Sequence, residues 1–222
     1  MHNPSSLLSL LNLLWIVCGS SVQKAFHSPS NIPYSRRGAR SLTEATATSD
    51  VERQALVDLY YSTNGEWWID SSNWLVGDPC ENQWYGIACN EHGGGVEVWF
   101  QENNMTGTLE ESIGNLKNVT YLVLVRQELE GEIPASIGNM TNLLGFYGYQ
   151  NHFKGRVPEF TNCKALSHVN LKENLHLSGR IPSFSSNPKL ISLDLHNNTL
   201  SGPIPSFSSN PLLEYINLQL NN

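Results

Sequence analysis

The stretch LISLDLHNNTLSGPIPSFSSNPLL, residues 190–213, contains the complete form of a pattern that recurs through the second half of the chain. Two residues after its glycine stands an aliphatic residue, and a proline follows directly. Fixed residue types that recur at one period of 20 to 50 residues indicate a stacked repeat architecture. The glycines of the five copies, spaced by 24, 24, 24 and 23 residues, are Gly107, Gly131, Gly155, Gly179 and Gly202.

A short alternating segment precedes each of these glycines. Alternation of apolar and polar residues with a period of two predicts a β-strand. One strand and its return path cannot bury their own apolar side chains, so we expect neighbouring copies to stack into a solenoid with one continuous core. The inward pairs are Val98/Phe100, Leu122/Leu124, Phe146/Gly148, Val169/Leu171, Leu193/Leu195 and Ile216/Leu218.

This pattern resembles the leucine-rich repeat family in its plant-type form, LxxLxLxxNxLxGxIPxxLGNLxx, over about residues 90–222. The resemblance implies a repeat (solenoid) fold of the α/β class, a right-handed superhelix with a parallel β-sheet on its concave side. It places about five repeats and a partial sixth strand in residues 93–222. It also implies a secreted or cell-surface recognition module that is not an enzyme and needs no cofactor.

Polar residues at the exit of each strand have a mechanical role in this scheme. An amide side chain both donates and accepts, so stacked copies can satisfy turn backbone groups that would otherwise be buried without partners. Gly148 and the extra residue in Asn174–Leu177 predict local irregularities, and Cys163 is expected to be a buried apolar residue. The exit residues are Asn103, Gln127, Asn151, Asn174, Asn198 and Asn221.

The N-terminal residues predict secretory entry. Residues 1–20 contain an apolar run of about 12 residues followed by small residues, which is typical of a signal peptide and short for a membrane-spanning helix. Residues 21–49 are expected to be a linker or pro-segment. Arg36-Arg37 could be a processing site, and the acid-free stretch up to Thr43 also resembles a signal-plus-transit leader for plastids.

Residues 50–92 are expected to cap the first repeat. Ser49 and Glu52 form a capping box before a helix whose face carries Val51, Ala55, Leu56 and Leu59. The Trp-rich segment that follows resembles the paired-cysteine cap of plant-type repeats, and most of its rings are expected to form the cap's core. In an oxidising compartment Cys80 and Cys89 are expected to form a disulfide, with a zinc site that includes His92 as the alternative.

The solvent-directed strand residues predict the binding surface. They align across repeats in rows, and the first three repeats carry aromatic residues where the later repeats carry polar ones. Exposed Trp and Tyr on a rigid sheet are typical of recognition surfaces, although strands also favour aromatic residues for their own sake. The predicted ligand-binding residues are Trp99, Gln101, Tyr121, Val123, Tyr147, Tyr149, His168 and Asn170.

The composition of the chain excludes one class of binding partner. A formal net charge of −7 with 15% charged residues gives no basic surface for nucleic acid. We expect a protein, peptide or glycan ligand and a possible membrane co-receptor. A secreted inhibitor of a cell-wall-degrading enzyme is the alternative function. His168 and His196 lie near Asp194, but they do not indicate an active site, because no nucleophile motif or metal-binding motif accompanies them.

Two further expectations concern the surface and the last turn. Four glycosylation sequons are present, although about four are expected from the Asn, Ser and Thr content alone. After its sixth strand the sequence carries no terminal cap, so this turn is expected to fray or to be covered by a partner. The sequons lie at Asn104, Asn118, Asn139 and Asn197.

Overall fold

The computed structural model describes residues 48–89 and 95–222. Every described residue belongs to one compact unit, Glu44–Asn222. The predicted signal peptide and nearly all of the predicted linker therefore lie outside the described residues, as does His92 of the alternative zinc site.

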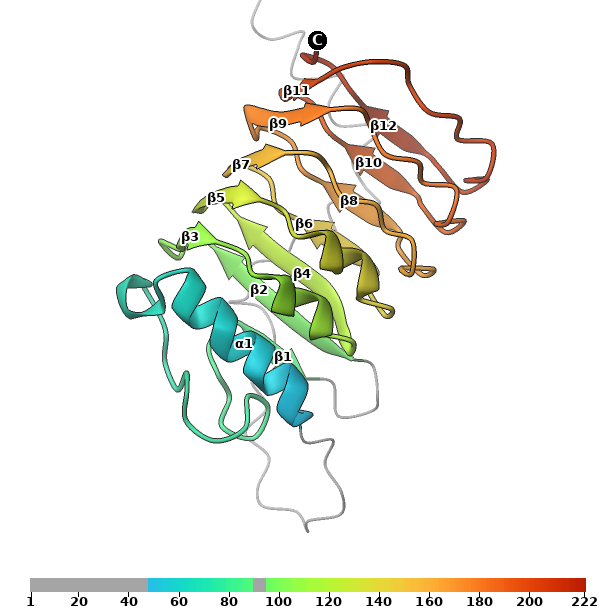
Figure 1. Cartoon of the computed structure of the whole chain (residues 1–222). Coiled ribbons are helices and arrows are strands. Elements are labelled where there is room, and N and C mark those ends of the chain that lie inside the picture. Colours follow the sequence, from blue (N-terminus) through green and yellow to red (C-terminus); the bar gives the residue numbers. More distant parts are fainter. Residues whose placement is uncertain (1–47, 90–94) are drawn as a thin grey trace, which may run out of the picture. The chain divides into compact units, whose positions relative to one another are not determined.

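The described residues coil into a stack with two sheets (Figure 1). All strand pairs are parallel except β1 with β2, so the expected solenoid with a parallel sheet is confirmed. The second sheet was not expected from the sequence. The seven-stranded sheet contains β1 (Ile87–Cys89), β2 (Val96–Gln101), β4 (Val119–Val125), β6 (Gly145–Tyr147), β8 (His168–Asn170), β10 (Ser192–Asp194) and β12 (Tyr215–Asn217); the five-stranded sheet contains β3 (Thr106–Thr108), β5 (Glu128–Glu132), β7 (His152–Gly155), β9 (His176–Gly179) and β11 (Thr199–Leu200).

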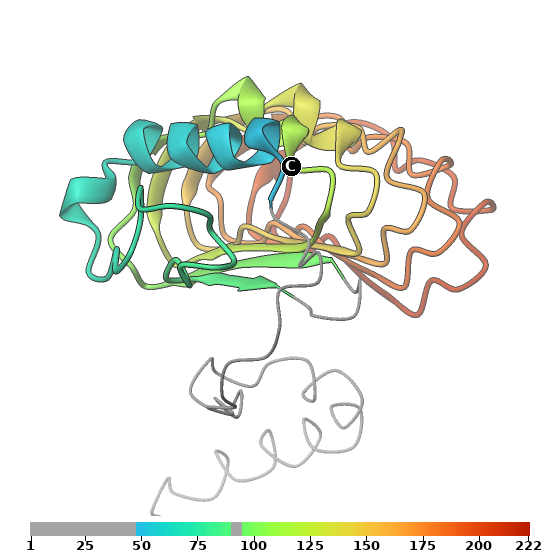
Figure 2. The same cartoon turned by 90° about the horizontal axis from the view of Figure 1, so that it is seen from below.

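Helical segments lie on the side of the coil opposite the seven-stranded sheet (Figure 2). They are α1 (Asp50–Ser62), which covers the first turn, and the short 3₁₀ helices η4 (Glu111–Asn115) and η5 (Ala135–Asn139), with η3 (Gly65–Trp67) directly after α1. The two long walls of the coil are therefore a sheet on one side and helices or irregular return segments on the other.

The start of α1 confirms Ser49 as the N-cap and corrects one residue of the predicted helix face. The backbone N–H of Glu52 donates to Ser49 Oγ at 3.2 Å. Val51 is 60% exposed, whereas the Glu52 side chain is buried. The Glu52 carboxylate accepts hydrogen bonds from Asn118, at 2.6 Å from the backbone N–H and 2.9 Å from Nδ2. A polar residue thus replaces Val51 on the buried face because it satisfies backbone groups of the first repeat.

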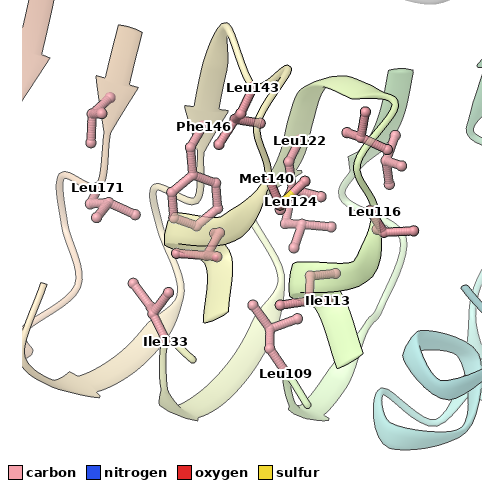
Figure 3. Close-up of a cluster of buried hydrophobic side chains, with 14 of the residues drawn as sticks. Leu109, Ile113, Leu116, Leu122, Leu124, Ile133, Met140, Leu143, Phe146 and Leu171 are labelled. Atoms are coloured by element: carbon pink, nitrogen blue, oxygen red, sulfur yellow. The ribbon is translucent and has the colours of Figure 1, made fainter. Parts of the chain in front are cut away.

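The core is the predicted ladder of aliphatic residues. Leu122 and Leu124 of β4 point between the two walls, where they meet Ile113 and Leu116 from the helical side (Figure 3). Phe146 and Leu171 continue the ladder in later turns, and all of these side chains are buried in one continuous cluster. Since each turn shares this cluster with its neighbours, the stack is stabilised as a unit.

The strand-exit amides form the predicted ladder. Asn174 Nδ2 donates to the carbonyls of Gly148 and Leu171, each at 3.0 Å, and its Oδ1 accepts from the Phe153 N–H at 3.2 Å. Gln127 makes the same kind of contact in place of an asparagine: its Oε1 accepts from the Asn103 N–H at 3.0 Å, as Asn198 Oδ1 accepts from the Asn174 N–H at 3.0 Å. The ladder therefore satisfies backbone groups of adjacent turns in the buried interior.

A left-handed residue precedes each amide of the ladder, a regularity that sequence analysis missed. The φ angles lie between 52° and 57°, in a region that few non-glycine residues adopt. The chain turns there from the seven-stranded sheet into the return path, so the same strained turn recurs once a repeat. The residues are Glu102, Arg126, Gln150, Glu173, Asn197 and Leu220.

The irregularity predicted at Gly148 does not disturb the strand ladder, since the Gly148 N–H donates to the Asn170 carbonyl at 2.9 Å, as the Leu171 N–H does to the Asp194 carbonyl. A Cβ at Gly148 would lie 3.1 to 3.3 Å from Leu171, Phe146 and Phe153, so these side chains occupy the space of the missing one. The extra residue near Asn174 is taken up at Leu175, whose side chain is exposed. Buried Cys163 is a free thiol, as expected.

The cap contains the expected disulfide between Cys80 and Cys89. Trp68, Trp74 and Trp84 are buried, and the Trp74 ring centroid lies 4.9 Å from that of Trp68 and 4.8 Å from that of Trp84. These rings form the cap's core, as predicted. Trp67, in contrast, is exposed.

Candidate functional site

The outward residues of the seven-stranded sheet form the predicted rows. β-Pairing places Trp99 beside Val123, Val123 beside Tyr147, and Tyr147 beside Asn170. Because side chains alternate along a strand, these residues point away from the main core, on the face that the resemblance predicts to be concave. We call this surface the outer sheet face.

The first three repeats carry an aromatic patch on this face, but it is less exposed than predicted. Val123 is 4% exposed and Tyr147 is 8% exposed, so both are buried instead of solvent-directed. They belong to a cluster separate from the main core, in which neighbouring side chains cover one another. We define this aromatic patch by its members Trp99, Tyr121, Val123, Val125, Tyr147 and Tyr149.

Gly145 makes room for the rings of the patch. A Cβ at this position would lie 2.7 Å from the Tyr147 ring and 2.8 Å from the Tyr121 ring. Both rings therefore lie over the glycine backbone of β6. The absence of a side chain in this row is a requirement of the patch, which the sequence alone did not indicate.

Burial changes the ionisation of groups in and beside the patch. It raises the pKa of the Tyr147 phenol, and the nearby Tyr121 and Tyr149 raise it further. Burial also raises the pKa of Tyr121, with a smaller contribution from the charge of Glu97, and raises the pKa of Glu97 itself. The tyrosines of the patch therefore stay neutral and act as donors, acceptors and apolar surface at physiological pH.

Trp99 carries a polar atom without a partner. Its indole N–H is buried and has no hydrogen-bond acceptor in the part of the chain that the structure describes. A buried donor without an acceptor is unfavourable by about 1 to 3 kcal/mol. The patch therefore contains one buried N–H donor, that of Trp99, without an acceptor among the described residues.

A polar row borders the patch where the strands end. Arg126 donates to Glu102 at 2.7 Å from a terminal guanidinium nitrogen and to Gln150 Oε1 at 2.8 Å from Nε. Gln150 Nε2 donates to Glu173 Oε2 at 2.8 Å. These side chains come from the left-handed turn positions, so the repeating backbone brings residues about 24 apart in sequence into one network.

The remaining predicted binding residues lie around the patch. Gln101 is exposed at the end of β2. Tyr149 is covered in part by Lys172, which is not one of the predicted residues and whose Nζ lies 5.1 Å from the Tyr149 ring centroid. His168 stacks on Tyr147 with ring centroids 6.4 Å apart, and burial lowers the pKa of its imidazole. Asn170 is half-buried in the next strand. All eight predicted positions therefore belong to one continuous face.

On the outer sheet face, the later repeats bring together two of the three residues considered for catalysis, His196 and Asp194. His196 Nδ1 lies 2.8 Å from Asp194 Oδ1, and His196 Nε2 lies 3.7 Å from Glu173 Oε1. Both imidazole nitrogens thus face carboxylates, and neither faces a hydroxyl or thiol that it could activate. In residues 48–89 and 95–222 there is also no group of three or more His, Cys, Asp or Glu side chains that could hold a metal ion.

The four sequons differ in their surroundings. Asn104 Nδ2 donates to the Trp67 carbonyl at 2.8 Å, and the Asn118 amide is bound to Glu52. Asn139 is exposed in η5, and Asn197 is half-buried beside the outer sheet face. Glycosylation of these residues stays a prediction.

Three comparisons place this architecture among known proteins. The model of the Leucine Rich Repeat family matches residues 189–211, the last complete repeat. The matched repeat is similar to that family. A curated relative, Protein STRUBBELIG-RECEPTOR FAMILY 2 of Arabidopsis thaliana, is 33% identical over 88 residues, which is 40% of this chain and 12% of the relative.

Solved structures of plant leucine-rich repeat proteins share the fold. The ectodomain of the Arabidopsis receptor kinase HAESA in complex with an N-terminally extended IDA peptide hormone is 25% identical, with a TM-score of 0.64. The match covers 77% of this chain and 29% of that one. A chain of the BIR3–SERK2 complex from Arabidopsis thaliana is 28% identical, with a TM-score of 0.55. This match covers 76% of the present chain and 92% of the chain in the complex.

The matches cover only part of the related proteins, so the functions of the whole relatives are not transferred to this chain. This chain spans about an eighth of the length of the curated relative and under a third of the HAESA chain. Among its described residues, no helix is long and apolar enough to cross a membrane.

Proposed function

We propose that this leucine-rich repeat protein is a recognition module, receptor-like or secreted, that binds a protein or peptide through the aromatic patch. The observation that carries the proposal is the patch itself, a cluster of aromatic and aliphatic side chains on the side of the sheet away from the core. Val123 and Val125 support the half-exposed rings of Tyr121 and Tyr149, and such rings on a rigid sheet are typical of a surface that contacts another molecule.

The similar structures support this proposal at the level of the class. The HAESA structure is that of a receptor kinase ectodomain in complex with a peptide hormone, and BIR3–SERK2 is a complex of two proteins. A rigid stack with a broad face is suited to a peptide or a protein surface, because neighbouring repeats present residues at a fixed spacing. We place this role at the cell surface or in the extracellular space, with a co-receptor as a further partner, and a binding role in place of catalysis.

The test is a binding screen of the whole chain against arrayed extracellular proteins and peptides. Substituting Tyr121→Ala and Tyr149→Ala, two half-exposed rings, should reduce binding of the strongest hit by at least about tenfold. The matched control is Ser192→Ala with Tyr215→Ala on the polar half of the same face. Equal loss in both variants, or none in the first, would contradict the proposal.

A further inference from the structure

Glu97 of β2 is an acidic residue at the edge of the aromatic patch. The register places it beside Ala88 of β1 on one side and Tyr121 of β4 on the other. Its side chain is half-buried, and within residues 48–89 and 95–222 it forms no hydrogen bond and no ion pair. A carboxylate withdrawn from water without a partner is destabilised in its charged form, in agreement with its raised pKa.

The other acids of the outer sheet face all have partners. Glu102 accepts from Arg126 at 2.7 Å, and Glu173 accepts from Gln150 at 2.8 Å. Asp194 lies 2.8 Å from His196. Among the described residues of this face, Glu97 is therefore the acid whose charge the chain itself does not compensate.

The basic residues of this face are also engaged elsewhere. Arg126 is held between Glu102 and Gln150, and the Lys172 ammonium lies over the Tyr149 ring. Both come from the strand-exit side of the patch, whereas Glu97 stands near the start of β2. Among the described residues, neither of these cations is available to Glu97, which leaves its carboxylate open to a cation of a bound molecule.

Two aromatic rings next to Glu97 add to the attraction of this site for a cation. Tyr121 is its direct neighbour across the strands, and Trp99 follows two residues later on the same face of β2. The face of an aromatic ring attracts a cation, most strongly where water is partly excluded.

We propose that Glu97, Tyr121 and Trp99 bind a basic side chain, lysine or arginine, of a peptide segment of the partner. The inference rests on the proposed function, since it names the chemistry of the ligand for the same surface. A peptide fits better than a free amine because the patch continues from Tyr121 into the apolar cluster around Val123, which favours a cation flanked by apolar residues. The chain's acidic net charge further favours a basic ligand.

The experiment uses capped hexapeptides with apolar flanks and a single central lysine, arginine, norleucine or citrulline. Their affinities for the whole chain are measured by isothermal titration calorimetry. The lysine and arginine peptides should bind at least about tenfold more tightly than their neutral counterparts. Glu97→Gln should remove this preference, because it deletes the charge and keeps the shape.

The control variant is Glu128→Gln, an exposed acid of β5 on the other sheet. It should leave the preference unchanged. The inference is overturned if the basic peptides do not bind, if Glu97→Gln keeps the preference, or if Glu128→Gln weakens it equally. Spermidine that binds more tightly than the basic peptides would also overturn it, in favour of a free polyamine.

The outcomes separate this inference from the proposed function. If lysine and norleucine peptides bind equally well and Tyr121→Ala weakens both, the patch is a binding surface without a cation site. If the partner found in the screen is insensitive to the patch variants while the basic peptides still require Glu97, the cation site exists and the proposed function fails.

Discussion

The first and last repeats of this solenoid solve the same packing problem with different residues. On the helical side, one core position is occupied in successive turns by Leu116, Met140 and Cys163, all buried apolar residues. The next two turns place Asn187 and Asn210 there, equally buried. Asn187 Nδ2 donates to the carbonyls of Phe160 and Cys163, each at 2.9 Å, so the amide replaces apolar packing with backbone hydrogen bonds.

The outer sheet face changes along the same direction. The row that begins with Trp99, Val123 and Tyr147 continues as Asn170, Asp194 and Asn217, and apolar clustering gives way to hydrogen bonds. The inward positions of the same strands carry no charged or hydrogen-bonding side chain in any turn. The comparison teaches that the inward positions hold the stack together, whereas the outward positions are free to define a surface.

The largest difference between the two regions is expected in the core. Leu122 is 0% exposed and its counterpart Ile216 in the last turn is 42% exposed. Leu122→Ala should lower the free energy of unfolding by about 3 kcal/mol because it leaves a cavity, and Ile216→Ala by about 1 kcal/mol or less. Urea denaturation followed by circular dichroism measures both. Equal losses would show that the last turn packs as tightly as the centre.

The amide ladder allows a second comparison with matched bonds. Asn221 Nδ2 donates to two carbonyls, those of Leu195 and Leu218, as Asn174 does in its turn, but Asn221 is only half-buried. Asn174→Ala should destabilise the fold by about 2 kcal/mol, because buried carbonyls lose their donors. Asn221→Ala should have a smaller effect since water can replace the amide. A larger loss for Asn221→Ala in the same denaturation assay would contradict this account.

The buried thiol of Cys163 gives a pH-dependent test of the middle of the stack. Burial raises its pKa to about 11. Between the ordinary thiol pKa and this value, the folded state keeps a proton that the unfolded state has lost, so stability falls as pH rises. From pH 8 to pH 10 the thiol should contribute a loss of about 1 to 2 kcal/mol.

Cys163→Ala is the control for this effect, because it removes the thiol and leaves the tyrosines that also titrate at high pH. The free energy of unfolding is measured at both pH values in both proteins. The variant should lose less stability than the parent over this interval. Parallel losses would show that Cys163 does not titrate differently in the folded state.

The smallest effect on stability is expected at Gly145, where the patch depends on a missing side chain. Gly145→Ala should change stability by less than about 1 kcal/mol, because the gain in backbone order offsets displacement of the rings. The near-ultraviolet circular dichroism should change, since the new Cβ pushes the Tyr121 and Tyr147 rings. Ser192→Ala, in the same row of the polar half, should leave that spectrum unchanged.

Much of the scaffold could be predicted from the sequence because its rules repeat. The aliphatic period, the strand-exit amides and Cys163 were all placed correctly, since each position has the same environment in every turn. Val51 was wrong because helix periodicity cannot show that Glu52 finds backbone donors in a residue 66 positions away. Asn187 and Asn210 were missed as a second set of buried amides for the same reason.

The candidate surface was predicted as a set of residues but not in its detail. Strand register followed from the repeat, so the eight predicted positions share one face. Their burial did not follow, because Val123 and Tyr147 are covered by side chains of adjacent turns. Lateral contacts depend on side-chain size in neighbouring repeats and on the space left by Gly145.

The sequence by itself determined the coil, because a constant spacing of Leu, Asn, Gly and Pro fixes where each turn bends and which side it buries. Only the tertiary structure decided which charges are compensated. Arg126 and Glu102 lie 24 residues apart and meet at 2.7 Å, while Glu97 is left beside aromatic rings without a partner in the described chain. Pairing of charges depends on distances between side chains of different turns, and a one-dimensional pattern does not contain those distances.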